Sequence, residues 1–308
     1  MPRGSILGPL LFILYINDIS LHLENSSIDL YADDSTLYAY GDSNREIENK
    51  LQTNISSIVN WCSTNNMALH PSKTKCMLLG SRNKLKHMQE LSIHINETKI
   101  ENVSIQKLLG VYIDHNLTWD VQINKVCNKL NSKLSLLKRL SHFLNEDMKK
   151  LFYNSYIMST FDYCCPVWAK SKQTHIRKIT TLQKRAGKII LQKPMRTPSI
   201  EIFERLKWLT FENRINYHTG ILVFKTLNNQ CPEYMKDIIS FSNNEVYNLR
   251  SSVKKDVAHI RFKTQHMKHS FSYHSRLFWN SLPKEIRSAL TVQSFKSKSK
   301  KYLFNTQF

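Results

Sequence analysis

The sequence predicts an α+β fold in which short strands dominate the first third of the chain and helices dominate the remainder. β-prone runs separated by turn residues recur up to residue 113, whereas later apolar residues recur every three or four positions. The chain has 308 residues, of which 41% are apolar and 22% charged, with only 7 Gly and 8 Pro. This composition is typical of a folded globular protein and excludes collagen, a coiled-coil rod and wholesale disorder.

The first third is predicted to contain a hairpin, a helix and further short strands. Residues 10–19 form an apolar run whose periodicity leaves helix and strand open. Residues 28–40 form two β-prone runs around Ala32-Asp33-Asp34-Ser35, which predicts a hairpin with two carboxylates at its tip. Apolar residues at helical spacing predict a helix over 43–62, with Ser43 as its N-cap. Further strands are predicted over 76–79, 91–95 and 105–113.

The remaining two thirds are predicted to be mainly helical. An apolar stripe predicts a long helix over 119–140, and the opposite face of this helix carries Lys125, Lys129 and Lys133. Further helices are predicted over 145–161, 175–190, 208–227 and 271–280. Loops are predicted over 194–198 and 241–254, and a basic run occupies 294–301.

The net charge is the most unusual feature of the composition. Forty-four Lys and Arg stand against 24 Asp and Glu, which leaves a formal charge of +20. Such an excess indicates a polyanionic partner, and nucleic acid is favoured over an anionic membrane surface.

Neither the cysteines nor the amino terminus indicate secretion. The six cysteines form no C-x-x-C pair and no Cys/His cluster at metal-ligand spacing, which is typical of reduced, mostly buried thiols. The apolar run after Arg3 is interrupted by Gly8-Pro9 and has no small-residue cleavage site behind it. It is also shorter than the roughly 20 apolar residues that a membrane span needs. The sequence therefore predicts an intracellular protein that does not enter a membrane.

The paired carboxylates Asp33 and Asp34 are the strongest candidates for chemistry. An isolated Asp-Asp pair is often only a turn, because Asp favours turns and solvent. Here both flanks are apolar and β-prone, so we expect the pair to stand at a fixed place at the edge of a packed sheet. Rigid carboxylates of this kind suit Mg²⁺, which prefers oxygen ligands and often bridges to substrate phosphates.

Two sequence blocks resemble the reverse transcriptases of non-LTR, jockey-like retrotransposons. Tyr31-Ala32-Asp33-Asp34 resembles the YADD box of this family. Residues 4–12 (GSILGPLLF) and 15–19 (YINDI) resemble the segment that immediately precedes the box. YADD alone is a weak signal, but the two blocks in the right order and at about the right distance make the resemblance specific.

Weaker similarities to the same family continue along the chain. Residues 61–74, which include Lys73, are similar to the block that follows the catalytic box. Residues 108–114 (LLGVYID) resemble the LGV-x-ID element of the palm and primer-grip region. Less specific similarities to the helical carboxyl-terminal portion of jockey-like elements lie at 161–168, 182–186, 231–232 and 278–283.

The resemblance implies a domain organisation. Residues 1–118 would form a partial reverse-transcriptase palm, made of the hairpin and a short antiparallel sheet with helices. Residues 119–192 would form a helical thumb-like region, and residues 193–308 a basic helical extension.

The resemblance also implies an activity and its partners. The family consists of RNA-directed DNA polymerases that transfer nucleotides by a two-metal mechanism, with Mg²⁺ or Mn²⁺ as cofactor. An RNA template, a DNA primer and deoxynucleoside triphosphates would be the partners, in the nucleus or in a cytoplasmic ribonucleoprotein. Asp33 matches the principal metal ligand and catalytic residue, with Asp34 beside it. Residues matched to template or nucleotide contacts are Gly4, Ser5, Pro9, Tyr31 and Lys73. For Lys73, a solvated lysine at a strand end is an equally good interpretation.

The chain departs from the family pattern in two ways. Arg3 stands where the family usually has Gln. The chain also begins at this block, whereas the family has fingers and a palm strand with another metal-binding aspartate upstream. Because the two-metal reaction needs carboxylates from both places, we expect this amino-terminally truncated fragment to be inactive alone. The alternatives are a non-catalytic nucleic-acid-binding remnant, and an unstable relic that exposes a sheet edge and the apolar residues 10–16.

The lysine row of residues 125, 129 and 133 is a candidate contact with a nucleic-acid backbone. Lysines at four-residue steps on one helix face can follow successive phosphates. For any single lysine, a solvated face opposite a core stripe is the competing interpretation. The row predicts salt-sensitive, largely sequence-independent binding, and the oligomeric state stays undetermined.

Overall fold

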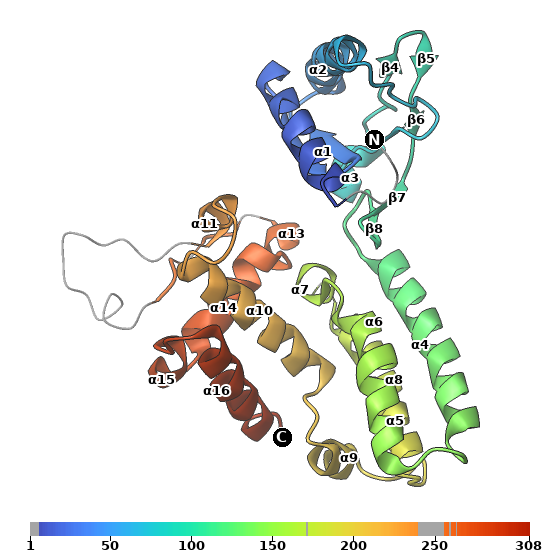
Figure 1. Ribbon diagram of the computed structural model, residues 1–308, viewed down its shortest axis with the longest axis vertical. Coiled ribbons are helices and arrows are strands. Elements are labelled where there is room, and N and C mark those ends of the chain that lie inside the picture. The colour runs from blue at the N-terminus through green and yellow to red at the C-terminus, as the bar shows by residue number, and fades with distance from the viewer. Residues whose placement is uncertain (1–5, 171, 240–255, 259, 263) are drawn as a thin grey trace, which may run out of the picture. The chain divides into compact units, whose positions relative to one another are not determined.

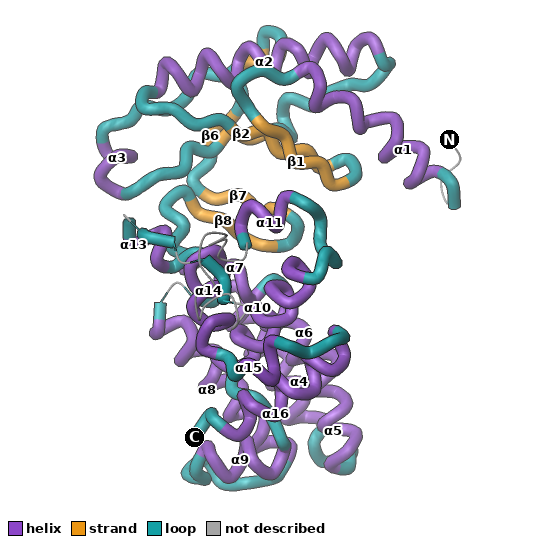
Figure 2. Tube along the Cα trace, turned by 90° about the vertical axis from the view of Figure 1, so that its left-hand side faces the viewer, coloured by secondary structure: helices purple, strands orange, loops and turns teal. Residues whose placement is uncertain are grey.

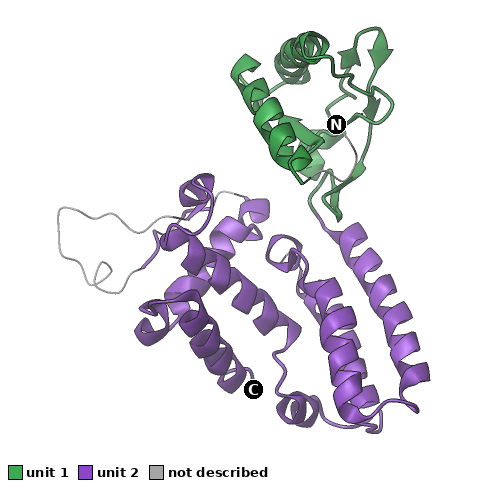
Figure 3. Cartoon of the chain, in the orientation of Figure 1, with its two compact units in different colours: residues 1–117 green, residues 118–308 purple. Residues whose placement is uncertain are grey.

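The computed structural model describes residues 6–170, 172–239, 256–258, 260–262 and 264–308, and it divides the chain into two compact units, residues 1–117 and 118–308 (Figures 1 and 3). All strands of the described residues belong to the first unit, and the second is built from helices (Figure 2). The predicted α+β class, with strands early and helices late, is therefore confirmed. The predicted division of the helical part at residue 192 stays a prediction.

The first unit begins with the segment for which periodicity left helix and strand open. It is helix α1 (Gly8–Ile16), with Pro9 in its first turn, and it continues as the 3₁₀ helix η1 (Asn17–His22). The long helix α2 (Asn44–Thr64) follows after a hairpin, and Ser43 caps it as predicted by accepting a hydrogen bond from the backbone N–H of Glu46. A short helix α3 (Arg82–Lys86) lies between later strands.

The strands of the first unit form four separate two-stranded pairs and not one sheet. Three pairs are antiparallel hairpins and the fourth is a parallel pair. The strands are β1 (Ser27–Tyr31), β2 (Asp34–Tyr38), β3 (Lys75–Cys76), β4 (His94–Ile95), β5 (Thr98–Lys99), β6 (Glu101–Asn102), β7 (Ile105–Leu108) and β8 (Val111–Asp114). The antiparallel pairs are β1–β2, β4–β5 and β7–β8, and the parallel pair is β3–β6.

Two strand predictions were wrong in extent. The strands predicted over 76–79 and 91–95 shrink to two-residue pairings. The strand predicted over 105–113 is a hairpin, β7–β8, because Leu109 and Gly110 both adopt positive φ, 45° and 86°. Two consecutive residues with positive φ produce the tight turn whose twist matches that of paired strands.

Helix α2 contributes residues to both apolar clusters of the first unit. Toward its C-terminus Ile58, Trp61 and Cys62 pack with Ile16 and Ile19, and the hairpin β1–β2 adds its apolar side chains to this cluster. Near its N-terminus Ile47 packs with Leu91, Ile93, Ile95 and Ile100. The amphipathic pattern of α2 thus serves two small cores.

The second unit consists of helices joined by short turns. Its first half comprises α4 (Asp120–Leu140), α5 (Glu146–Phe152), the π-helical turn η2 (Tyr153–Met158), α6 (Ser159–Asp162), α7 (Cys165–Trp168) and α8 (Gln173–Ile190). Its second half comprises α9 (Ser199–Leu206), α10 (Phe211–Leu227), α11 (Tyr234–Ile238), α13 (Gln265–Lys268), α14 (Phe271–Ser281), α15 (Lys284–Arg287) and α16 (Val292–Asn305). The helices predicted over 119–140, 175–190 and 271–280 agree with α4, α8 and α14.

Two predicted helices and the predicted basic run need comment. The helix predicted over 145–161 is one continuous rod whose middle is the π-helical turn η2. The helix predicted over 208–227 begins later, at Phe211, because Thr210 is its N-cap. The basic run 294–301 is part of the ordered helix α16, in which Phe295, Ser299 and Leu303 are buried at four-residue steps. The loop predicted over 194–198 is confirmed, because these residues form turns and coil before α9. The loop predicted over 241–254 lies outside the described residues.

Candidate functional site

The hairpin β1–β2 carries the paired aspartates at its closed end. The register pairs Tyr31 with Asp34, so Ala32 and Asp33 alone form the turn and Asp34 is the first residue of β2. Ala32 has a φ of 52°, in the left-handed region that favours glycine. A non-glycine residue held there costs on the order of 1 kcal/mol, which the pairing of the two strands must offset.

The two faces of this hairpin differ in burial, because side chains alternate along each strand. Ile28, Leu30 and Leu37 point to one face and pack against the cluster around Trp61. Because successive side chains in a strand alternate, Asp34 projects from the opposite, exposed face. The apolar face thus anchors the hairpin to α2 and presents the carboxylates to solvent.

Asp29 is a third carboxylate on this exposed face, and the motif comparison missed it. It pairs across the hairpin with Thr36, two positions along β2 from Asp34, so the two carboxylates are diagonal neighbours. The alternation of residues 28–31 was the signal that could have found it. Asp29, Asp33 and Asp34 are all exposed.

The donor set of the hairpin fits a hard divalent cation. Carboxylate oxygens are the ligands that Mg²⁺ prefers, and exposed carboxylates leave room for substrate phosphates and water. Within the described residues, however, Asp33 and Asp34 do not belong to any group of three ligand atoms close enough to enclose one ion. The described hairpin supplies ligands for a metal but not a closed metal cage.

Of the other residues predicted to contact template or nucleotide, the structure describes Pro9, Tyr31 and Lys73. Gly4 and Ser5 lie outside the described residues. Pro9 is exposed in the first turn of α1, and Tyr31 is 67% exposed beside the aspartates. Lys73 is exposed in the turn before β3, where its backbone N–H bonds to the carbonyl of His70.

The predicted lysine row on α4 is not uniform. Lys125 and Lys129 are exposed. Lys133 is half-buried; its ammonium donates to the carbonyl of Tyr156 and to Oγ1 of Thr160, both at 2.6 Å, and lies 3.8 Å from the centre of the Tyr156 ring. Burial and the neighbouring Lys129 lower the pKa of Lys133. The Lys133 side chain therefore links α4 to η2 and α6. Of the three lysines in the row, Lys125 and Lys129 are the exposed ones.

A second cluster with metal-ligand composition lies inside the second unit. Asp162, Cys165 and His218 place their ligand atoms within 4.8 Å of one another. Arg214, however, donates from Nε to Oδ1 of Asp162 at 2.7 Å and from Nη2 to the other carboxylate oxygen. Burial would raise the pKa of Asp162, but the bonds from His218 and Arg214 outweigh it and lower the pKa. A guanidinium already fills the cation position, so this cluster is a buried ion pair.

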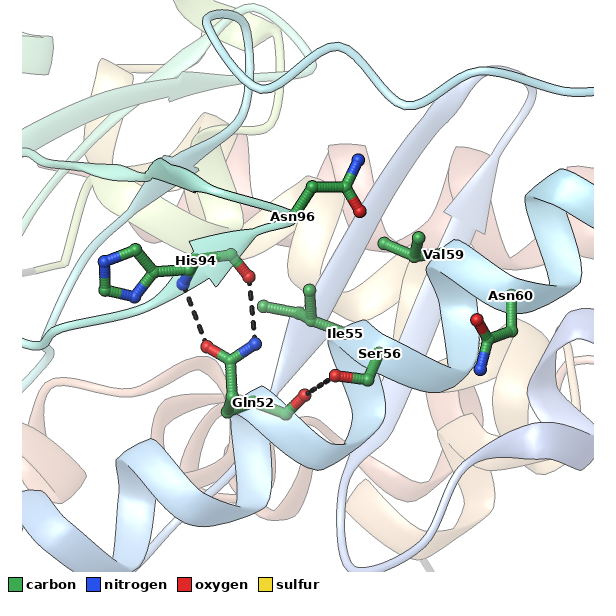
Figure 4. Close-up of a pocket in the computed structure, with 7 residues that line it drawn as sticks. All are labelled: Gln52, Ile55, Ser56, Val59, Asn60, His94 and Asn96. Atoms are coloured by element: carbon green, nitrogen blue, oxygen red, sulfur yellow. Dashed lines mark hydrogen bonds between the residues drawn. The ribbon is translucent and has the colours of Figure 1, made fainter.

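A pocket of about 200 Å³ between α2 and the β4–β5 turn offers no chemistry of its own (Figure 4). Two of its polar residues bond to each other: the Gln52 side-chain amide both donates to the carbonyl of His94 and accepts from its N–H, at 2.9 Å each. Ser56 donates to the Gln52 carbonyl. None of the residues predicted for catalysis or binding lines it.

Charge is divided unequally between the two units. Residues 1–117 contain ten Lys and Arg against twelve Asp and Glu, whereas residues 118–308 contain thirty-four against twelve. The first unit is thus nearly neutral, and the second carries the whole basic excess. In the part of the chain that the structure describes, no helix combines the length and apolarity needed to cross a membrane.

The family comparison shows which proteins the first unit is similar to. Residues 1–113 match the sequence profile of the family described as "Reverse transcriptase (RNA-dependent DNA polymerase)". This region includes α1, the aspartate hairpin, α2 and most of β8. The first unit of the chain is therefore similar in sequence to reverse transcriptases.

The curated relatives that the chain is similar to are proteins of mobile elements. The chain is 24% identical over 229 residues to "Probable RNA-directed DNA polymerase from transposon X-element" of Drosophila melanogaster, covering 71% of this chain and 25% of that protein. It is 24% identical over 213 residues to "RNA-directed DNA polymerase from mobile element jockey" of the same species, covering 65% and 23%. A polyprotein of the type-1 element R1 2 of Nasonia vitripennis is 26% identical over 174 residues, covering 54% and 42%.

These matches confirm the resemblance to jockey-like, non-LTR reverse transcriptases. The chain spans about a quarter of the length of the first two relatives. No solved structure matches it significantly.

Proposed function

We propose that this chain supplies the catalytic hairpin of an RNA-directed DNA polymerase of a non-LTR element. The observation that carries the proposal is the position of Asp33 in a two-residue turn and of Asp34 at the start of β2, on a hairpin anchored to α2 by its apolar face. The match of residues 1–113 to reverse transcriptases and the printed names of the relatives support it.

The proposed cofactor is Mg²⁺, or Mn²⁺ in its place, held by Asp33 and Asp34. When bound, the metal would neutralise charge on the phosphates and on the attacking and leaving oxygens of nucleotidyl transfer. The chain's own residues would position the reactants. Lys73 would contribute a cation near the triphosphate, and Tyr31 and Pro9, with Gly4 and Ser5, would contact template or nucleotide. The substrates would be an RNA template, a DNA primer and deoxynucleoside triphosphates, in the nucleus or in a cytoplasmic ribonucleoprotein.

The proposed division of labour follows the two units. Residues 1–118 would act as the palm portion, 119–192 as a thumb and 193–308 as a helical extension. The basic excess of residues 118–308 supports a nucleic-acid contact there. Lys125 and Lys129 are exposed on α4 and suit that contact, and Lys133 would act mainly by holding α4 against η2.

The proposed catalytic site needs a further carboxylate. Two-metal transfer requires ligands that hold two ions about 4 Å apart, and no third ligand encloses an ion with Asp33 and Asp34 among the described residues. We therefore expect this chain alone not to extend a primer. Primer extension on an RNA template with Mg²⁺ or Mn²⁺ tests this: a metal-dependent product that Asp33→Ala abolishes would overturn the proposed incompleteness.

Metal binding at the hairpin can be tested separately. Mn²⁺ should broaden the NMR amide signals of residues 31–35, and Asp33→Asn with Asp34→Asn should remove the broadening. Glu97 is a matched control, because it follows Asn96, which has the same φ of 52°, in the two-residue turn of β4–β5. Equal broadening at the two turns, or none at the hairpin, would contradict the metal assignment.

A second candidate function is nucleic-acid binding without catalysis, and the charge of the second unit favours it. The Mn²⁺ measurement discriminates the two. Nucleic-acid binding by a native chain whose residues 31–35 show no Mn²⁺ broadening would support the non-catalytic function.

A further inference from the structure

The hairpin that carries the aspartates is held to the first unit by apolar packing and by hydrogen bonds at its two ends. Among the described strands, β1 and β2 pair only with each other, so no neighbouring strand fixes where the hairpin stands. Its apolar side chains pack against the cluster around Trp61. Such packing is non-directional, whereas hydrogen bonds have a preferred geometry. The orientation of the hairpin therefore depends on the hydrogen bonds.

One face of α2 bonds to both ends of the hairpin. Glu46, Lys50 and Asn54 are four residues apart, so they are neighbours on the helix surface. The Glu46 carboxylate accepts from the backbone N–H of Asp42 at 3.0 Å. The Lys50 ammonium donates to the carbonyl of Tyr40 at 2.9 Å. These two contacts lie after β2, and Asn54 makes the corresponding contact before β1.

Asn54 bonds to both peptide groups of one residue. Its Oδ1 accepts from the backbone N–H of Glu24 at 2.7 Å, and its Nδ2 donates to the carbonyl of Glu24 at 2.5 Å. Nδ2 also donates to the carbonyl of Lys50, one turn earlier in α2, at 2.7 Å. The side-chain amide thus pairs with Glu24 as a neighbouring strand would, three residues before β1 begins.

Burial makes this contact specific. Asn54 is only 1% exposed, and a buried amide that loses its partners carries a large desolvation penalty. Asn25, the next residue after Glu24, has a φ of 58°, in the left-handed region that asparagine tolerates. The chain therefore turns at Asn25 immediately after the bonded residue. Asn54 and this turn together define one path into β1.

The aspartates lie at the opposite end of the hairpin from this contact. Strand β1 runs from Ser27 to Tyr31, which places the turn about 13 Å from the base at about 3.3 Å per residue. A rotation of about 10° at the base would therefore move the carboxylates by about 2 Å. Misplacing a reacting group by about 1 Å can cost on the order of 100-fold in rate.

We propose that Asn54 is a positioning residue that sets the orientation of the aspartate hairpin relative to α2. Its amide bonds to the backbone of Glu24, so it acts through β1 and not by contact with metal or substrate. The catalytic meaning of this inference rests on the proposed function of Asp33 and Asp34. The orientation of the hairpin itself can be measured without metal.

Gln52 offers a matched control on the same helix. Its side-chain amide pairs with His94 in the same way, accepting from the N–H and donating to the carbonyl at 2.9 Å each (Figure 4). His94 begins β4, and its neighbours Ile93 and Ile95 belong to the cluster around Ile47. Loss of the Gln52 contact should therefore disturb β4–β5 and leave the aspartate hairpin in place.

The first test compares Asn54→Leu with Gln52→Met by NMR of the full chain. Leucine is the branched apolar analogue of asparagine and leaves the peptide groups of Glu24 unpaired. Asn54→Leu should weaken the NOEs from the methyl groups of Leu30 and Leu37 to the cluster around Trp61. It should also speed exchange of the hydrogen-bonded amides of β1 by about tenfold, because local opening becomes easier. Gln52→Met should leave these NOEs unchanged and keep β1 exchange within about twofold of the native rate.

Mn²⁺ provides a readout that general destabilisation does not change. Its broadening falls steeply with distance, so Mn²⁺ at the hairpin also reports where the hairpin stands relative to α2. In Asn54→Leu, broadening of residues 31–35 should persist, because the turn that carries the aspartates is unchanged. The broadening of α2 amides should differ from the native pattern, whereas Gln52→Met should reproduce that pattern.

Asn54→Asp is the conservative variant, and it serves if Asn54→Leu does not fold. A protonated carboxyl has one O–H donor and an acceptor, so it can replace the amide at Glu24, whereas the ionised form cannot donate to the Glu24 carbonyl. Burial should raise the pKa of the new carboxyl above its usual value. The hairpin NOEs should therefore be native while this carboxyl is protonated and weaken as it ionises, with the native chain at each pH as reference.

Two results would overturn the positioning role. One is a native set of hairpin NOEs and native β1 exchange in Asn54→Leu, or in Asn54→Asp with its carboxyl ionised. The other is equal disturbance of the hairpin by Asn54→Leu and Gln52→Met, which would mean that both amides stabilise the unit as a whole. Absence of Mn²⁺ broadening at residues 31–35 of the native chain would instead overturn the metal assignment. The NOEs and the exchange rates would then still decide whether Asn54 orients the hairpin.

Discussion

The two units of this chain solve the problem of burying apolar surface differently. The largest fully buried aromatic side chains of the described residues all lie in the second unit, including Trp168, Trp279, Tyr153 and Phe161. The first unit relies on two small apolar clusters and isolated strand pairs. Its helix α1 is apolar nearly all round, yet Leu10, Ile13 and Leu14 are each more than half exposed.

The two units also differ in the charged side chains that they carry. The sparsely packed, nearly neutral unit carries the carboxylates, where a low positive charge nearby leaves them available to a metal. The densely packed helical unit carries the basic excess, because long helices opposite a continuous core present whole faces to solvent. Variants that perturb packing should therefore affect the second unit more than the first.

The largest expected effect is at the buried ion pair of the second unit. Arg214→Met should destabilise that unit by about 3 kcal/mol, because it leaves the carboxylate of Asp162 buried without its main partner. Urea unfolding followed by tryptophan fluorescence measures this, since four of the five tryptophans lie in residues 118–308.

Two further variants are controls for Arg214→Met. Lys150→Met removes an ion pair with Glu146 whose side chains are more exposed, 33% and 38%, and should cost no more than about 0.5 kcal/mol. Asp162→Asn combined with Arg214→Met should be less destabilising than Arg214→Met alone, because no unpaired charge remains. A single variant that costs no more than Lys150→Met would show that the cluster is not an energetically coupled pair.

A smaller effect is expected at the contact between α8 and α9. A Cβ at Gly187 would overlap Cγ2 of Ile202 and lie 3.2 Å from Cδ1 of Leu206. Gly187→Ala should therefore destabilise the second unit by about 1 to 2 kcal/mol, although alanine is the better helix former. Hydrogen exchange detected by mass spectrometry locates the loss in α8 and α9.

Gly80→Ala is the counterpart in the first unit. Its Cβ would meet only the flexible end of Leu85, at 3.2 Å, so exchange in the first unit should change little. If the two alanine variants were equally disruptive, the proposed contrast in packing would be wrong.

The smallest effect on stability is expected at α1. Leu10→Gln with Leu14→Gln should change the free energy of unfolding by less than about 0.5 kcal/mol, because both side chains are already exposed. The same variant should lower self-association in sedimentation velocity, since exposed apolar patches promote association. Ile16→Gln is the control, because Ile16 is the last residue of α1 and is only 6% exposed. This variant should destabilise the first unit by about 2 kcal/mol. Unchanged self-association would show that the exposed α1 face does not drive contacts between copies.

Local patterns in the sequence predicted much of the fold. Ser43 and the apolar spacing behind it predicted α2, and the runs around Ala32-Asp33 predicted the hairpin, because capping and strand alternation act within a few residues. The segment 105–113 defeated the same reasoning. Its turn depends on positive φ at Leu109, a conformation that leucine does not favour and that only the paired strands hold in place.

The candidate sites show the same division between local and tertiary information. Residue type and spacing alone predict the carboxylate pair, its position between two β-prone runs and the basic excess of the later residues. The fold was needed to show that Asp29 shares the face of Asp34 and that Lys133 is tied to Tyr156. It was also needed to show that Arg177, Lys178, Lys184 and Arg185 have no acidic partner within the described residues. Whether a charged side chain is free or engaged depends on residues distant in the chain, and packing alone brings these together.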